Sequence, residues 1–127
     1  MNINKFTQKS MESVQNCEKL AYEYGNQQIE QEHMLYSLLT IEDSLILKLI
    51  TKMNIQKEQF LNETAQAIEK LPKVRGGQIY ISNDLNKVLI SAEDEAKAMG
   101  DEYVSVEHLF LAMLKQPSKA VKELFRN

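Results

Sequence analysis

The feature that most constrains this chain is an internal duplication with an offset of 75 residues. The segment GDEYVSVEHLFLAML, at 100–114, has an earlier copy, GNQQIEQEHMLYSLL, at 25–39. Residues 10–50 align with 85–125 without a gap, with seven identities among 41 pairs and matching apolar positions throughout. A repeat of this kind must be recognised first, because each copy is one structural unit. We therefore expect two similar structural halves.

Apolar residues recur at steps of three and four along most of the chain, which predicts helices. Helix ends are marked as well: Thr7 is a good N-cap preceded by Phe6, and Gly25 and Gly100 supply the left-handed residue that ends a helix. Seven helices are expected: after Thr7, over about 31–41, after Asp43 or Ser44, over about 56–71, after Ser82 or Asn83, after Ser105, and from Pro117-Ser118.

Residues 72–81, PKVRGGQIYI, interrupt the helical pattern. Pro72 and the Gly76-Gly77 pair are typical of a linker, and residues 78–81 are expected to be extended. Ile29 is expected in a short loop. We interpret 1–127 as one domain, with repeat one at 1–71, a linker at 72–81 and repeat two at 82–127. The counterpart of the fourth helix would lie at about 131–146, so we expect the chain to be a fragment.

Composition excludes several classes of function. The chain is 43% hydrophobic and 26% charged, with a net charge of −3 and no basic stripe, so a nucleic-acid partner is not expected. Its one cysteine cannot form an internal disulfide, which fits a reducing compartment. The N-terminus lacks the apolar stretch of a secretory signal, and no apolar run is long enough to span a membrane. We expect a soluble, cytoplasmic domain.

Catalytic motifs are missing. No GxxxxGK[ST] loop is present, so nucleotide hydrolysis is not expected in this segment. The histidines, His33 and His108, hold equivalent places in separate repeats, and the i+4 positions that a zinc pair would need are Ser37 and Ala112. Cys17 aligns with an alanine, as expected for a small buried residue. We predict no catalytic residues, no metal site and no enzyme activity in this segment.

Glu32 and Glu107 precede the two histidines and allow two interpretations. Each lies in the first turn of its helix, where the helix dipole stabilises a carboxylate by roughly 0.3–1 kcal/mol. Alternatively, a first-turn carboxylate beside free backbone N–H groups can bind a partner that carries a basic group or both charges. Spacing alone leaves both interpretations open.

Three groups of residues carry a family resemblance. FTQKS near the start, A-x-x-x-G-x-x-x-[IV]-x-x-E-H-[ML]-[LF]-x-x-[LM]-L in both halves, and LPKV before the linker resemble the N-terminal domain of Clp AAA+ unfoldases. The resemblance implies an all-α fold of two pseudo-twofold four-helix repeats, eight helices in all, of which this chain would hold seven. It also implies that ATP and Mg²⁺ are bound by two ATPase modules that follow, in a hexameric ring, and that this segment binds no cofactor.

The resemblance further implies a binding function. Such N domains bind exposed segments of unfolded or aggregated proteins, or adaptor proteins, and pass them to the ring. In ClpB-type disaggregases the residues that match Thr7, Asp101 and Glu107 take part in substrate handling, and the groove beside them would include Leu89 and Phe6. Each has a structural alternative: Thr7 as a helix cap, Leu89 as core, Asp101 as a solvated turn residue. A regulatory scaffold that binds no client is the alternative function.

The ClpC-type unfoldases, which feed the ClpP peptidase, have a similar N domain. There the glutamates that match Glu32 and Glu107 lie in pockets that bind phosphorylated arginine. The LPKVRGG and GDEYVSVEHL segments favour the ClpB type, and Glu30-Gln31 stands where ClpC-type domains carry Gly-Thr. A negative charge at Glu30 would oppose a phosphate in the first of these pockets. The choice between ClpB type and ClpC type stays open.

Overall fold

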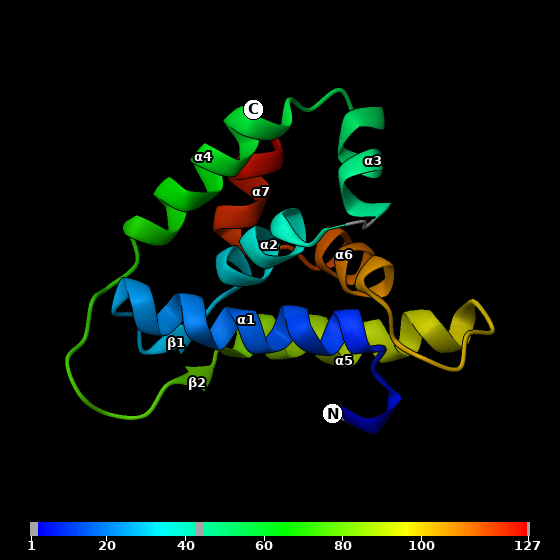
Figure 1. Ribbon diagram of the computed structural model, residues 1–127, viewed down its shortest axis with the longest axis horizontal. Helices are drawn as coiled ribbons and strands as arrows, with labels where there is room; N and C mark the ends of the chain where they lie inside the picture. The colour runs from blue at the N-terminus through cyan, green and yellow to red at the C-terminus, as the bar shows by residue number, and fades with distance from the viewer. Residues whose placement is uncertain (1–2, 43–44, 127) are drawn as a thin grey trace.

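The computed structural model describes residues 3–42 and 45–126, and nearly all of its regular structure is helical (Figure 1). The all-α fold expected from the sequence is therefore confirmed. Asp43 and Ser44, the expected caps of the third helix, lie outside the described residues. In chain order the elements are η1 (Ile3–Lys5), α1 (Gln8–Tyr24), β1 (Gln28–Ile29), α2 (Gln31–Thr40), α3 (Leu45–Lys52), α4 (Lys57–Glu69), β2 (Tyr80–Ile81), α5 (Asn83–Ala98), α6 (Val106–Lys115) and α7 (Lys119–Arg126).

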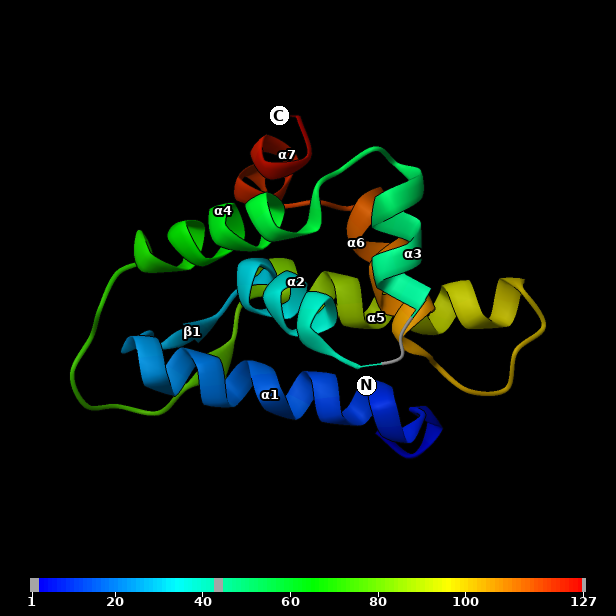
Figure 2. The ribbon, with the colours of Figure 1, turned by 45° about the horizontal axis from the view of Figure 1, so that its top comes forward.

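Helices α2 and α6, which carry the two copies of the Glu-His motif, form the centre of the core. Helix α2 packs against α1 and α4, α6 packs against α5 and α3, and α7 contacts α4 and α2 (Figures 1 and 2). Their apolar side chains are almost fully removed from water, which is the main stabilising contribution to the fold. The buried apolar residues are Met34, Leu35, Leu38 and Leu39 in α2, and Val106, Leu109, Phe110, Ala112 and Met113 in α6.

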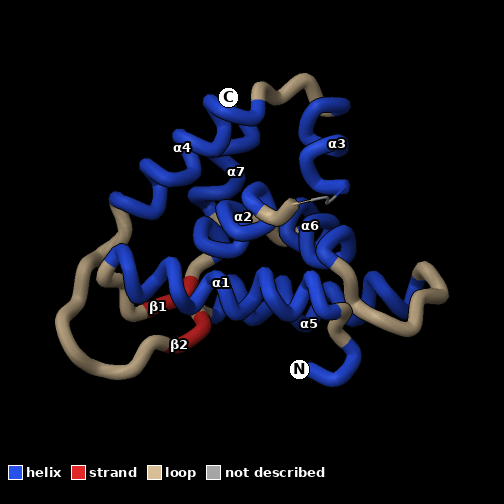
Figure 3. Tube along the Cα trace, viewed as in Figure 1, coloured by secondary structure: helices blue, strands red, loops and turns tan. Residues whose placement is uncertain are grey.

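Two short parallel pairings lock the halves together. In the first, β1 pairs with β2, with Ile29 opposite Ile81 (Figure 3). In the second, Val104 forms a parallel bridge with Phe6. Val104 lies 75 positions after Ile29, and Ile81 lies 75 positions after Phe6. The second pairing is therefore the duplicate of the first. The expectation that Ile29 lies in a loop was wrong, because its partner strand comes from beyond α4 and leaves no local trace.

Helices α1 and α5 begin with equivalent caps. The Thr7 hydroxyl accepts a hydrogen bond from the Ser10 N–H (3.2 Å), and the Ser82 hydroxyl accepts one from the Leu85 N–H (3.1 Å). The backbone N–H of Thr7 donates to Val104 (2.9 Å) and that of Ser82 to Ile29 (3.0 Å). Each cap therefore joins the start of a long helix to the strand pairing described above.

These caps give a paired prediction. The T7A and S82A variants should each lower the free energy of unfolding by about 1 kcal/mol, because each loses the side-chain acceptor for a first-turn N–H. Urea unfolding followed by circular dichroism measures the loss. The T7S variant keeps the hydroxyl and should stay close to wild type. A loss for S82A but none for T7A would contradict the structural equivalence.

Other details of the helix prediction need correction. The apolar spacing of the fifth helix predicts that Met99 is buried, but this residue is 56% exposed, because α5 ends at Ala98 and the chain turns away. The spacing along the fourth helix predicts six core positions, of which Phe60, Thr64 and Ile68 are buried. The other three are only half-buried: Leu61, Ala65 and Leu71.

Candidate functional site

The two histidines of the Glu-His motifs perform the same structural task. The Nδ1 atom of His33 accepts a hydrogen bond from the Glu30 N–H (2.9 Å), and Nδ1 of His108 accepts one from the Ser105 N–H (2.8 Å). Each histidine is the third residue of its helix, and its side chain accepts the backbone N–H of the residue that caps the helix, as glutamate does in a capping box. Because Nδ1 accepts, each neutral ring carries its proton on Nε2.

The second ring nitrogen finds a different partner in each half. His33 Nε2 lies 2.9 Å from Asn26 Oδ1, and His108 Nε2 lies 2.8 Å from Asp101 Oδ2. Asn26 and Asp101 hold equivalent positions in the duplication. Burial lowers the pKa of His33 to about 4, so this imidazole is neutral at pH 7. The histidines are held inside the protein and are not arranged to bind a metal together.

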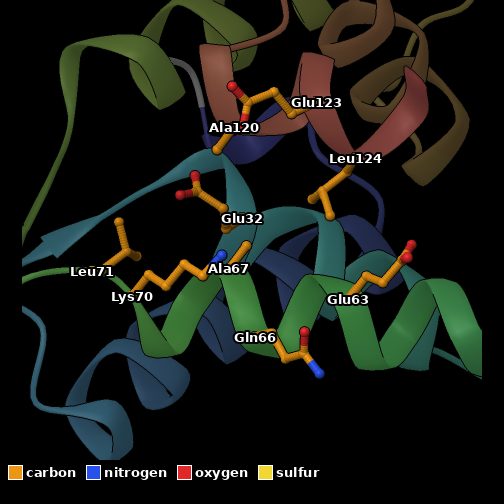
Figure 4. Close-up of a pocket in the computed structure, with 9 residues that line it drawn as sticks. All are labelled: Glu32, Glu63, Gln66, Ala67, Lys70, Leu71, Ala120, Glu123 and Leu124. Carbon is orange, nitrogen blue, oxygen red and sulfur yellow. The ribbon is translucent and has the colours of Figure 1, made fainter. Parts of the chain in front are cut away.

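A pocket of about 350 Å³ opens at the start of α2. Figure 4 shows Glu32 between helix α4 and helix α7, which form the walls of the pocket. Three carboxylates and one ammonium group line it, together with apolar side chains that include Leu71 and Leu124. We call this the Glu32 pocket; its lining residues are Glu32, Glu63, Gln66, Ala67, Lys70, Leu71, Ala120, Glu123 and Leu124.

Glu32 is an unusual residue in this pocket because its side chain is buried without a countercharge. The residue is only 5% exposed, and within the described part of the chain no lysine or arginine forms an ion pair with it. The pKa of Glu32 is raised to about 7, chiefly by burial and also by the nearby carboxylates of Glu30 and Asp84, although its own backbone N–H lowers it. Strongly shifted groups of this kind concentrate at functional sites.

Gln31 anchors the turn before α7, the helix that forms one wall of the pocket. Its Nε2 donates to the backbone carbonyls of Asp84 (3.1 Å) and Gln116 (3.0 Å), and its Oε1 accepts from the Ser118 N–H (2.8 Å). The start of α2 is thereby tied to the start of α5 and to the turn that precedes α7. The amide of Gln31 is used inside the protein, so Glu32 is the residue of this turn that faces the pocket.

The residues expected from the sequence to bind a client are divided by the structure. Asp101 and Glu107 belong to the segment 101–108, in which Asp101 is hydrogen-bonded to His108. Thr7 contacts the same segment, because its backbone N–H donates to the Val104 carbonyl. Asp101 is exposed and Glu107 half-buried. Leu89 is 0% exposed and Phe6 is 8% exposed, so both belong to the core. The expectation that they line an open groove is not met, because both side chains belong to the buried apolar cluster.

Neither a reactive thiol nor a metal-binding cluster is found among the described residues. Burial raises the pKa of the Cys17 thiol to about 12, which removes the thiolate that a nucleophile or metal ligand needs. No cluster of three or more metal-ligating side chains is found in residues 3–42 and 45–126. Among the described helices, none combines the length and apolar character needed to cross a membrane.

Comparison with known proteins places the chain in a family. The model of the Clp repeat (R) N-terminal domain matches residues 5–127. The chain belongs to this family of Clp N domains. The chaperone protein ClpB of Nitratidesulfovibrio vulgaris is 36% identical over 126 residues, which cover 95% of this chain. This Clp N domain spans about 15% of the length of that relative.

Solved structures share the fold of this Clp N domain. The Hsp104 N-terminal domain from Candida albicans has a TM-score of 0.84 and 23% identity, over 96% of this chain and 80% of that chain. A complex of the ClpV N-domain with a VipB peptide has a TM-score of 0.80 and 19% identity, over 98% of this chain and 79% of that chain. At such identities the likeness establishes the Clp N fold and nothing more.

Sequence reasoning on the Clp N motif missed part of the site. Glu32 was identified from its place in the repeat, but Glu63, Lys70 and Glu123, which complete the charges of the Glu32 pocket, were not. They come from α4 and α7, which meet α2 only in the folded chain. The duplication aligns Asn26 with Asp101, so the sequence shows that the two residues are equivalent but not that they contact the histidines.

Proposed function

We propose that this Clp N domain binds segments of unfolded or aggregated proteins, or of adaptor proteins, and that the Glu32 pocket receives a positively charged side chain of the bound segment. The observation that carries the proposal is the Glu32 carboxylate, which is 5% exposed and has no basic partner among the described residues. A buried carboxylate without a countercharge is costly, and a bound cation would supply the missing partner.

The charges of the pocket favour an unmodified arginine or lysine over a phosphorylated arginine. Glu63 and Glu123 line the pocket with Glu32, against the single ammonium of Lys70. A guanidinium group can pair with a carboxylate through two parallel hydrogen bonds. A phosphoryl group would instead bring about two negative charges to a site where carboxyl groups already outnumber the one ammonium group. The phosphoarginine function implied by the ClpC-type resemblance is therefore the less favoured candidate for this pocket.

The role of the whole protein is a wider proposal. The identity with ClpB supports a protein in which this domain passes bound segments to an ATP-driven hexameric ring for disaggregation. ATP and Mg²⁺ would be held by other parts of that protein. The ClpV N-domain solved with a VipB peptide supports peptide binding as a property that this fold can have. Delivery to the ClpP peptidase remains the alternative implied by the ClpC-type resemblance, and Thr7, Asp101 and Glu107 stay predicted client contacts.

The test is an NMR titration of the isotopically labelled domain with three peptides that differ at one residue: arginine, its neutral isostere citrulline, and phosphoarginine. We expect the arginine peptide to shift signals around Glu32 and to bind at least tenfold more tightly than the citrulline peptide. Its affinity should rise about tenfold from pH 6 to pH 8, because the Glu32 pKa of about 7 means that the carboxylate must first lose its proton.

The matched control exchanges the same residue in the other repeat. The E32Q variant should lose the preference for arginine and the pH dependence, whereas E107Q should keep both. Equal binding by wild type and E32Q would show that the pocket is not the site. Tighter binding of the phosphoarginine peptide would favour the ClpC-type function. If neither the peptides nor an unfolded model protein produced NMR shifts, the regulatory scaffold would be the better-supported function.

A further inference from the structure

A second hollow, of about 650 Å³, lies where α1 ends, between the end of α1 and the end of α4. Three of the five tyrosines of the chain line it, from the end of α1 and from α2, and two carboxylates stand beside them. We call it the tyrosine hollow and define it by Tyr22, Glu23, Tyr24, Tyr36, Glu69 and Lys73. Burial raises the pKa of Tyr24, and so do Tyr36, Glu69 and Glu23, which line the same hollow.

The fold does not require these tyrosines. In the second half the same helix end is built with Lys97, Ala98 and Met99 in place of Tyr22, Glu23 and Tyr24, and Leu111 replaces Tyr36. Tyr22 is also 77% exposed, so it contributes little to the core. An aromatic and acidic surface that only one of two equivalent halves carries is better explained by a ligand than by packing.

The tyrosine hollow already holds a cation. The Lys73 Nζ donates to the backbone carbonyl of Tyr24 (3.0 Å), lies 3.2 Å from Glu69 Oε1, and sits 5.8 Å from the centre of the Tyr24 ring. Helix α1 has no basic residue in its last turn, so Lys73 supplies the positive charge that a helix C-terminus favours. In the second half Lys97 lies within the last turn of α5 itself.

Lys73 belongs to the exposed loop between α4 and β2, and its side chain is half exposed. It is therefore held by surface contacts, which contribute little stability. Its single positive charge faces the two carboxylates of Glu23 and Glu69, so the hollow keeps a net negative charge. Arginine suits such a place better than lysine, since its planar group stacks on aromatic rings and is less strongly hydrated.

We propose that the tyrosine hollow binds an arginine side chain of a partner polypeptide, in the place that Lys73 now occupies. The guanidinium group would lie over Tyr24, with its donors toward Glu69 and the carbonyl at the end of α1. Lys73 acts as an internal competitor that leaves when the partner binds. This site is separate from the Glu32 pocket, and the inference does not rest on the function proposed for that pocket.

The experiment is a titration of the labelled domain with the peptide acetyl-Gly-Arg-Gly-amide, and with the same peptide carrying citrulline or lysine. The amide of Gly25 and the tyrosine ring signals report on the hollow. We expect these signals to shift with the arginine peptide, less with lysine and not with citrulline. Equal shifts with arginine and citrulline would overturn the proposal, because charge would then play no part.

Two variants make the test specific. The Y24M/Y36L variant installs the residues that the second half uses, so folding should be kept, and binding should weaken about fivefold with the loss of two ring contacts. The K73Q variant keeps a donor for the Tyr24 carbonyl but removes the charge, and it should bind two- to fivefold more tightly. Weaker binding by K73Q would refute the competition. The E32Q variant should behave as wild type at these signals, which separates this result from that of the Glu32 pocket.

Discussion

At pH 8 the E32Q variant is expected to be more stable than the wild-type domain by roughly 3 kcal/mol. The folded state holds the Glu32 proton with a pKa of about 7, against an ordinary value of 4.5. Stability from this group is complete below pH 4.5 and is lost as the pH rises through 7, at about 1.4 kcal/mol per pH unit between these two values. Glutamine resembles the protonated acid and carries no such loss.

The neighbouring His33 has the opposite effect on the pH dependence of stability. The pKa of His33 falls from 6.5 to about 4 on folding, so its contribution is complete above pH 6.5 and is lost as the pH falls toward 4. Between pH 4.5 and 6.5 the unfolded chain holds the proton on His33, whereas the folded chain holds it on Glu32. The two slopes cancel, and these two residues together should give a flat profile in this range.

Urea unfolding at pH 5, 6, 7 and 8 measures both effects. In E32Q the His33 slope is no longer compensated, so this variant should lose about 1.4 kcal/mol per pH unit below pH 6.5. The E107Q variant, with the same substitution in the other repeat, shows what removing a less enclosed first-turn carboxylate does. Parallel profiles for wild type and E32Q would mean that Glu32 does not hold its proton near neutral pH. A confirmed gain in the stability of E32Q would show that Glu32 destabilises the folded domain, as residues that serve binding often do.

Replacing Gln31 by alanine is expected to lower the free energy of unfolding by about 2–3 kcal/mol. The side chain makes three hydrogen bonds to backbone groups of α5 and of the turn before α7. Each such bond contributes about 1 kcal/mol, and leaving a partner unsatisfied costs more where water cannot reach it. The start of α7 would lose its anchor, and with it the wall of the Glu32 pocket that carries Glu123.

The Q31V variant is the sharper test, since valine is the residue that the second half has at this position, Val106. It keeps most of the volume and removes only the hydrogen bonds, so a loss close to that of Q31A is expected. Hydrogen exchange at Ser118 and Val121 should quicken in both variants. Q116A, which removes an exposed side-chain bond to Ser91, serves as the control and should change stability by less than about 0.5 kcal/mol. A Q31V domain as stable as wild type would contradict the anchoring role.

The duplication made most of the fold predictable from the sequence. Gly25 and Gly100, both with positive φ, end their helices where expected, and the caps at Thr7 and Ser82 form as expected. These features depend on residues within one turn of each other, so a local pattern is enough to find them. The equivalent places of the two histidines near their helix starts also follow from the duplication, whereas the partners of the second ring nitrogen do not.

What the sequence could not predict depends on distant contacts. The strand at Ile29 requires Ile81, and the burial of Leu89 depends on how α5 packs against α6. The walls of the Glu32 pocket come from helices far from Glu32 in the chain, and the raised pKa follows from their enclosure rather than from any motif. The tyrosine hollow shows the reverse case: its residues become notable only when the two halves are compared position by position.

The exchanged strand pairings have a consequence for how this domain folds. Phe6 must reach Val104, across almost the whole described chain, before the second pairing can form. Closing so large a loop has an entropic cost that no local contact offsets, and contacts of this range slow folding relative to other helical proteins. Neither repeat can form its strand pairing alone, because the extended segment before the second helix of each repeat pairs with a segment from outside that repeat. The two copies, similar as they are, should therefore fold and unfold as one cooperative unit and should not persist as separate halves.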